Sequence, residues 1–85
     1  MLELLDEAVT CFRLGHEGAG NDALARFTET MWKDLAEGRL TSNPSYLRPI
    51  LEEVVTAQER GDLLWVADLL EHELRPLLLP DDLVA

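Results

Sequence analysis

The stretch that decides the fold is Leu47–Leu78, which reads LRPILEEVVTAQERGDLLWVADLLEHELRPLL. Two helix-length patterns of apolar residues meet in it at Arg60-Gly61-Asp62. Glycine readily adopts the left-handed backbone conformation that commonly ends a helix, and aspartate is a good N-cap for the next one. Such a short connection makes the two helices antiparallel neighbours. The stretch therefore predicts an αα-hairpin that turns at Gly61.

The two ends of this stretch carry the same type of pentapeptide. Residues 47–51 are LRPIL and residues 74–78 are LRPLL. A hairpin bent at Gly61 brings the two prolines to the same end of the molecule. Proline influences where a helix begins or ends, so this repeat predicts a structural feature and not a catalytic or binding site.

The start of the hairpin's first helix depends on its prolines. Asn43-Pro44 can begin a helix, since proline is tolerated in a first turn. Pro49 would then lie inside the helix, where it removes a hydrogen bond and causes a kink. A start near Leu47 avoids this problem. We therefore predict the two helices of the hairpin over residues 46–60 and 62–78.

Two more apolar patterns at helical spacing precede the hairpin. They predict helices over residues 2–15 and 21–37. Residues 15–20, which hold three glycines, end the first helix, Asn21 is the N-cap of the second, and Gly38 is its stop. The apolar stripes are Leu5, Ala8, Val9 and Phe12 in the first helix and Leu24, Phe27, Met31 and Leu35 in the second. The predicted fold is all-α: an antiparallel bundle of four short helices in a single domain over residues 1–85.

The last helix has more apolar surface than one core-facing stripe needs. Its expected core stripe is Leu63, Val66, Ala67, Leu70, Leu74 and Leu77. Trp65 and Leu69 lie about 120 to 160° from the centre of this stripe at 100° per residue. We expect this second apolar ridge to be covered either by the first helix pair or by another chain.

Size and charge limit the possible functions. A chain of 85 residues buries only about 60 to 65% of its unfolded surface, which makes a deep catalytic cleft hard to build and favours a homodimer. The net charge is -10, with -4 in residues 1–43 and -6 in residues 44–85. Nucleic acid and anionic membranes require clustered Lys and Arg, so we expect neither as a partner. A basic or amphipathic protein partner remains possible, and so does a role of the charge in solubility alone.

The expected compartment is the cytoplasm. Cys11 is the only cysteine and cannot form an internal disulfide, which fits a reducing environment. No apolar run approaches the roughly 20 residues of a membrane span. The N-terminal sequence MLELLDE lacks the basic flank of a signal peptide.

Candidate chemistry is sparse in this sequence. We find no catalytic motif, no phosphate-binding loop and no complete set of metal ligands, and we expect no cofactor. Asp68 and His72 are spaced i, i+4 on one helix face with Glu71 and Arg75 close by, which could form one side of a metal site. A helical di-iron site instead requires Glu-x-x-His, and position 69 is leucine. We expect a surface cluster in which Asp68 contacts His72.

The candidates for contact with a partner are Trp32, Trp65, Leu69 and His72. Exposed tryptophan is enriched at interaction hot spots, although either tryptophan can instead complete the core of a small protein. Leu69 belongs to the second ridge with Trp65, and His72 lies beside that ridge.

The segment Tyr46–Leu78 supports a resemblance. Its residues YLRPILEE (46–53), AQERGD (57–62) and VADLLEHELRPLL (66–78) resemble a segment of short, uncharacterised helical proteins of Gram-positive bacteria that tend to be associated with motility genes. The sequence departs from that pattern at His72, where an aromatic residue such as tyrosine is expected. The resemblance implies a setting and transfers no functional residues.

Three functional hypotheses follow. The first is a non-enzymatic helical interaction protein, similar to flagellar export chaperones, which are small, acidic and helical and hold an amphipathic partner segment. The second is a metal-binding regulator or small enzyme centred on Asp68, Glu71 and His72. The third is a structural subunit that associates with copies of itself. The missing active-site chemistry favours the first hypothesis and a protein that is not an enzyme.

Overall fold

A computed structural model describes residues 1–40 and 42–78 of the chain. The described part is helical and has no strand. Its elements in chain order are α1 (Leu2–Arg13), α2 (Glu17–Ala36), α3 (Pro44–Glu59), α4 (Leu63–Asp68), the π-helical segment η1 (Leu69–Leu74) and α5 (Arg75–Leu78). The last three follow one another without a break, so the chain forms four rods. The predicted all-α bundle of four helices is confirmed.

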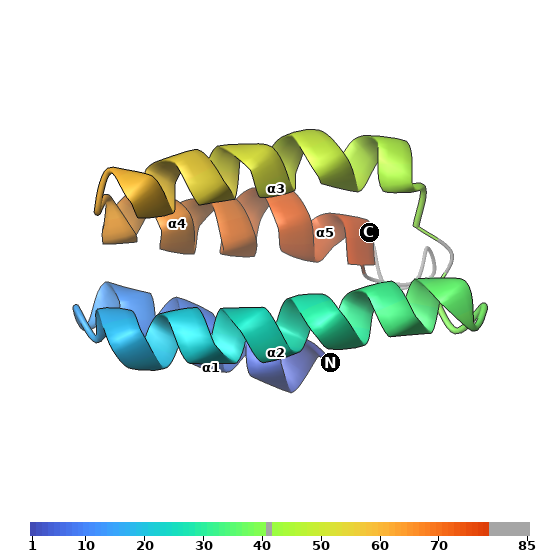
Figure 1. Cartoon of the computed structure of the whole chain (residues 1–85), viewed down its shortest axis with the longest axis horizontal. Helices are drawn as coiled ribbons and strands as arrows, with labels where there is room; N and C mark the ends of the chain where they lie inside the picture. The colour runs from blue at the N-terminus through green and yellow to red at the C-terminus, as the bar shows by residue number, and fades with distance from the viewer. Residues whose placement is uncertain (41, 79–85) are drawn as a thin grey trace.

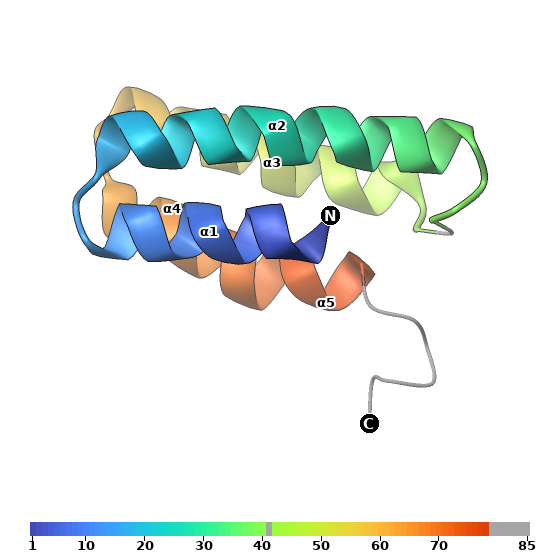
Figure 2. The same cartoon turned by 90° about the horizontal axis from the view of Figure 1, so that it is seen from below.

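The rods form two antiparallel hairpins that lie face to face. Figure 1 shows α1 and α2 as one layer, and α3 with the α4–η1–α5 rod as the other. The view from below shows α2 in front of α3, and α1 in front of α4 (Figure 2). Close packing joins α1 to α2, α1 to α4 and η1, and α3 to α4 and η1. Helix α1 is therefore the main link between the two hairpins.

Three glycines end the helices as the sequence predicts. Gly15, Gly38 and Gly61 have positive φ angles of 79°, 77° and 69°. Each lies in a Schellman motif, in which the amide of the glycine and the amide of the next residue donate to carbonyls of the last turn. At the hairpin turn, Gly61 N–H donates to the Gln58 carbonyl and Asp62 N–H to the Ala57 carbonyl, both at 3.0 Å. Asp62 then caps α4, since its Oδ1 accepts the Trp65 amide at 3.3 Å.

Helix α2 begins four residues before the predicted start. Its first residue is Glu17 and its N-cap is His16, so Asn21 lies inside the helix and does not cap it. The prediction failed because glycine is a poor helix former, and Gly18 and Gly20 made a loop the natural interpretation. Tertiary packing overrides that propensity. Gly20 is buried, and a Cβ atom there would lie 2.8 Å from both Cδ1 and Cε1 of the Phe12 ring.

Helix α3 also begins earlier than predicted. It starts at Pro44, and the Asn43 Oδ1 caps it by accepting the Ser45 amide at 2.9 Å. Pro49 lies inside the helix. The expected start near Leu47 was wrong because the strong N-terminal signal at Asn43-Pro44 outweighs one missing internal hydrogen bond. The exposed Pro49 position makes that loss tolerable, since water can satisfy the carbonyl left without a donor.

The π-helical segment η1 was not predicted. In it the Arg75 amide donates to the Leu70 carbonyl, five residues back. The segment ends just before Pro76, which lacks an N–H and whose ring clashes with the carbonyl four residues back in a regular α-helix. A π segment adds a residue to the turn, so the following positions shift round the axis by one. This shift explains why Leu78 is buried where Leu77 was expected, and Leu77 is only half-buried.

The core otherwise follows the predicted stripes. All four stripe residues of α1 are buried, as are the first three of α2, while Leu35 is half-buried and packs against the core. The buried residues that complete it are Leu47, Val54, Ala57, Val66, Ala67, Leu69, Leu70, Leu74 and Leu78, together with Ala23. No helix in the described ranges is long and apolar enough to cross a membrane.

The close approach of Phe12 to Gly20 gives a testable prediction. Gly20→Ala will lower the free energy of unfolding by about 1–3 kcal/mol, because the new methyl group forces a buried ring to move. Gly18→Ala is the matched control, since it lies in the same helix and its Cβ would meet nothing within 4 Å. The control will be neutral or more stable by up to about 1 kcal/mol, because alanine favours the helix. Urea unfolding of both variants measures the difference, and equal stabilities would contradict the packing argument.

Candidate protein-binding groove

Helices α2 and α3 face each other without packing closely. Among the described elements, α2 packs against α1, and α3 packs against α4 and η1. A mostly apolar groove of about 480 Å³ lies between them. Its wall residues are Asn21, Leu24, Ala25, Thr28, Glu29 and Trp32 of α2 and Leu51, Val54, Val55 and Gln58 of α3.

The groove runs along the two antiparallel helices. From Asn21 to Trp32 it spans about 16 Å of α2 at 1.5 Å per residue. One end is bridged by a hydrogen bond in which Gln58 Nε2 donates to Asn21 Oδ1 at 2.8 Å. The antiparallel arrangement brings Trp32 to the other end, on the side of Leu51. The result is an elongated apolar channel whose length matches about three turns of a helix.

The groove walls contain both buried core residues and apolar residues exposed to solvent. Leu24 and Val54 are buried core residues, and the half-buried Trp32 and Leu51 pack against that core. Val55 is 49% exposed although it is a large apolar side chain. Apolar surface of this kind, continuous with the core and left uncovered, commonly marks a site of interaction.

The structure separates the four predicted partner residues. Trp32 lies in the groove wall, whereas Trp65, Leu69 and His72 belong to α4 and η1 and do not line it. Leu69 is only 2% exposed, so the chain itself covers half of the predicted second ridge. Trp65 remains 38% exposed, and His72 is exposed. Leu69 is therefore part of the core rather than a free contact residue.

Val55 and the pairing of α2 with α3 across the groove were not predicted from the sequence. Leu51 and Val55 are spaced i, i+4, so they form a second apolar row on α3 beside its core stripe. That row was the sequence signal for a groove wall on α3. Whether it faces another helix or solvent depends on which helix lies opposite, and the sequence does not give the packing order of the bundle.

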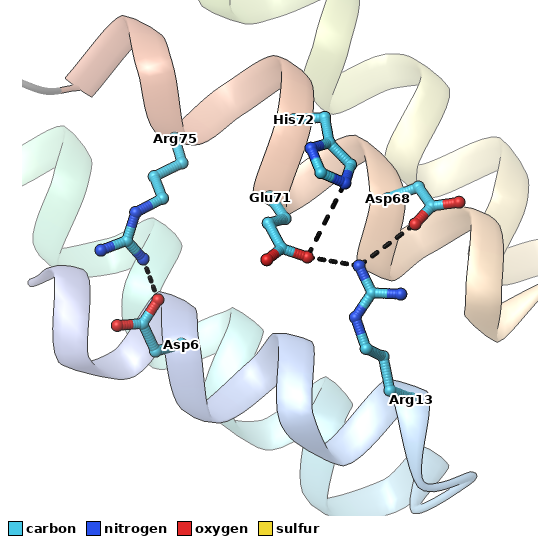
Figure 3. A network of polar contacts seen from close by, with 6 residues as sticks. All are labelled: Asp6, Arg13, Asp68, Glu71, His72 and Arg75. Atoms are coloured by element: carbon cyan, nitrogen blue, oxygen red, sulfur yellow. Dashed lines mark hydrogen bonds and ion pairs between the residues drawn. The ribbon is translucent and has the colours of Figure 1, made fainter. Parts of the chain in front are cut away.

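The acidic cluster predicted on the last rod lies on the other side of the molecule, against α1. Figure 3 shows the Arg13 side chain of α1 reaching between Asp68 and Glu71. Its Nη2 is 3.1 Å from Asp68 Oδ1 and also donates to Glu71 Oε2. His72 Nε2 is 3.9 Å from Glu71 Oε2. The expected Asp68–His72 contact was wrong, since Asp68 bonds to Arg13 and the π winding of η1 removes regular i, i+4 spacing.

A second ion pair joins the same two rods. Arg75 Nη1 donates to Asp6 Oδ1, so α1 is tied to the last rod both near its middle and at its C-terminal end (Figure 3). The hydrogen bond to Glu71, with a smaller contribution from Asp68, raises the pKa of Arg13 above its ordinary value. Arg13 is therefore cationic throughout the physiological range. These pairs close the α1 side of the bundle.

The side chains of Asp68, Glu71 and His72 are not arranged as a set of metal ligands. Within the described residues, no group of three or more His, Cys, Asp or Glu side chains is placed to hold a metal ion. The guanidinium of Arg13 occupies the space between the two carboxylates and neutralises part of their charge. The geometry is that of an ion-pair contact between helices.

The role of Arg13 can be tested by its salt dependence. Arg13→Gln will lower the urea midpoint, because Asp68 and Glu71 then face each other without a cation. The loss will shrink at high salt, since the side chains are partly exposed and their interactions are screened. Arg48→Gln is the control, as Arg48 is exposed and makes no ion pair among the described residues. A loss that is equal in both variants, or unchanged by salt, would contradict the assignment.

Comparisons with known proteins found no match to this chain. No family model matches the chain. No curated protein and no solved structure matches it significantly. The description of the groove therefore rests on the residues of this chain and on their arrangement.

Proposed function

We propose that this chain is a non-enzymatic helical interaction protein that holds an amphipathic helix of a partner protein in the α2/α3 groove. In this it is similar in kind to flagellar export chaperones. The observation that carries the proposal is the uncovered apolar seam between α2 and α3, in a bundle whose other seams are packed. Its single cysteine fits a cytoplasmic protein, which is part of the same proposal.

The shape of the groove favours a helix as the occupant. Two antiparallel helices with an apolar channel between them accept a third helix through anchors spaced i, i+3, i+4 and i+7. Trp32 at one end supplies a large, rigid contact surface of the type found at hot spots. Binding there removes the exposed part of Val55 from water without any change of fold.

A second copy of the chain is the competing occupant. Each copy has a charge of -10, so an interface between two identical acidic surfaces is opposed by repulsion. Sedimentation across a dilution series distinguishes the cases, since a concentration-dependent dimer would support self-association and a strict monomer would remove it. The metal-centred alternative at Asp68, Glu71 and His72 gains no support from an arrangement in which Arg13 bonds both acids.

The two tryptophans allow a direct test of the site. The probe is a synthetic peptide of about 18 residues, long enough to form a helix, with leucines on one face and neutral glutamines on the other. In Trp65→Phe, Trp32 is the only tryptophan, and its emission will shift to shorter wavelength when the peptide covers it. In the matched variant Trp32→Phe, the emission of Trp65 will not shift.

A third variant checks that the groove itself is the binding site. Val55→Gln, made in the Trp65→Phe background, will weaken binding about tenfold, because one partly exposed apolar anchor is lost. Unfolding curves show whether each variant is folded. A shift of Trp65 alone would move the site to α4, and no shift or heat of binding in either variant would overturn the proposal.

A further inference from the structure

We infer that the partner helix of the α2/α3 groove carries basic residues along the edges of its apolar face. This inference rests on the proposed function and specifies the chemistry of the occupant. The groove contains one ionisable wall residue, Glu29, and no basic one. Glu29 is exposed and makes no ion pair within the described residues. A docked helix therefore meets a carboxylate that is in no ion pair among the described residues, about one helical turn before Trp32 on the α2 wall.

The α3 edge of the groove is acidic as well. Glu52 and Glu59 lie at i-3 and i+4 from Val55, so they are its neighbours on the helix surface. Both are exposed, and neither makes an ion pair among the described residues. Together with Glu29 they place three free carboxylates around the most exposed part of the apolar channel.

The basic side chains of the chain compensate little of this charge. Within residues 1–40 and 42–78, four of the seven are used in internal ion pairs, namely those of Arg13, Arg26, Arg39 and Arg75. Of the cations close to the groove, Arg26 already binds Asp22. Lys33 and Arg48 are the i+4 and i-4 neighbours of Glu29 and Glu52, and Arg60 follows Glu59. None of these three cations makes an ion pair among the described residues, so the carboxylates at the groove edges stay open to a partner's cations.

Charge complementarity selects the occupant. A helix with acidic flanks, or a second copy of this chain, would place carboxylates beside these three glutamates. A helix with lysine or arginine flanks neutralises them and keeps its apolar face in the channel. Long basic side chains also lay their methylene groups over apolar surface, which suits a groove with half-buried edges.

Three peptides test the inference. They share one leucine face of about 18 residues and differ only in the flanking positions, which are lysine, glutamine or glutamate. Titration against the Trp65→Phe protein will rank the affinities lysine, glutamine, glutamate, with about a tenfold difference between the extremes at low salt. At about 0.5 M salt the difference will fall to about twofold, because the charges near the surface are screened.

Matched substitutions locate the charge effect. Glu29→Gln and Glu59→Gln will each weaken the lysine peptide about threefold and leave the glutamine peptide unchanged. Glu53→Gln removes the same charge from α3 on a position about 160° round the helix from Val55, and it will change neither affinity. Equal affinities for the three peptides, or equal effects of all three substitutions, would overturn the inference while the groove remains a binding site. Failure of every peptide to bind would overturn the proposed function itself.

Discussion

The contact between Phe12 and Gly20 sets the distance between α1 and α2. The ring edge of Phe12 occupies the place of a Cβ atom at position 20, so the two helices approach more closely than any other residue there would allow. Because α1 also packs against α4 and η1, this helix fixes the position of one hairpin on the other. The core closes around α1, and the seam farthest from it, between α2 and α3, is the one that stays open.

Electrostatics reinforce this asymmetry. Arg13 and Arg75 tie α1 and the last rod together through Asp68, Glu71 and Asp6. Across the molecule, one neutral hydrogen bond between Asn21 and Gln58 spans the open seam. Two cations, Arg13 and Arg75, thus cross the closed seam, while the carboxylates of Glu29, Glu52 and Glu59 beside the open seam make no ion pair among the described residues. Packing and charge thus distinguish a structural side of the bundle from a side available for binding.

Several parts of this architecture could be predicted from local signals. The hairpin at Gly61, the stops at Gly15 and Gly38, and the apolar stripe of α1 all follow from short-range backbone chemistry. The start of α2 could not be predicted, because glycine is a poor helix former and the close packing of Phe12 on Gly20 is a tertiary contact. The π segment had Pro76 as a signal, but the burial of Leu69 depends on how the rod packs against its neighbours. For the site, Trp32 was identified as a candidate contact, while its partner wall on α3 was not.

The sequence by itself determined a small, acidic, all-helical chain with sharp turns at fixed glycines, because capping and apolar periodicity act within a few residues. Only the tertiary structure decided that α1 links the hairpins, that Leu69 is core, and that Trp32 and Val55 line one groove. The physical reason is that a helix has several faces with similar apolar content, and the choice of neighbour for each face depends on the packing of the whole bundle. Helix α3, in the hairpin of residues 47–78, supplies one wall of the proposed site. Helix α2, which could not be placed opposite α3 from the sequence, supplies the other.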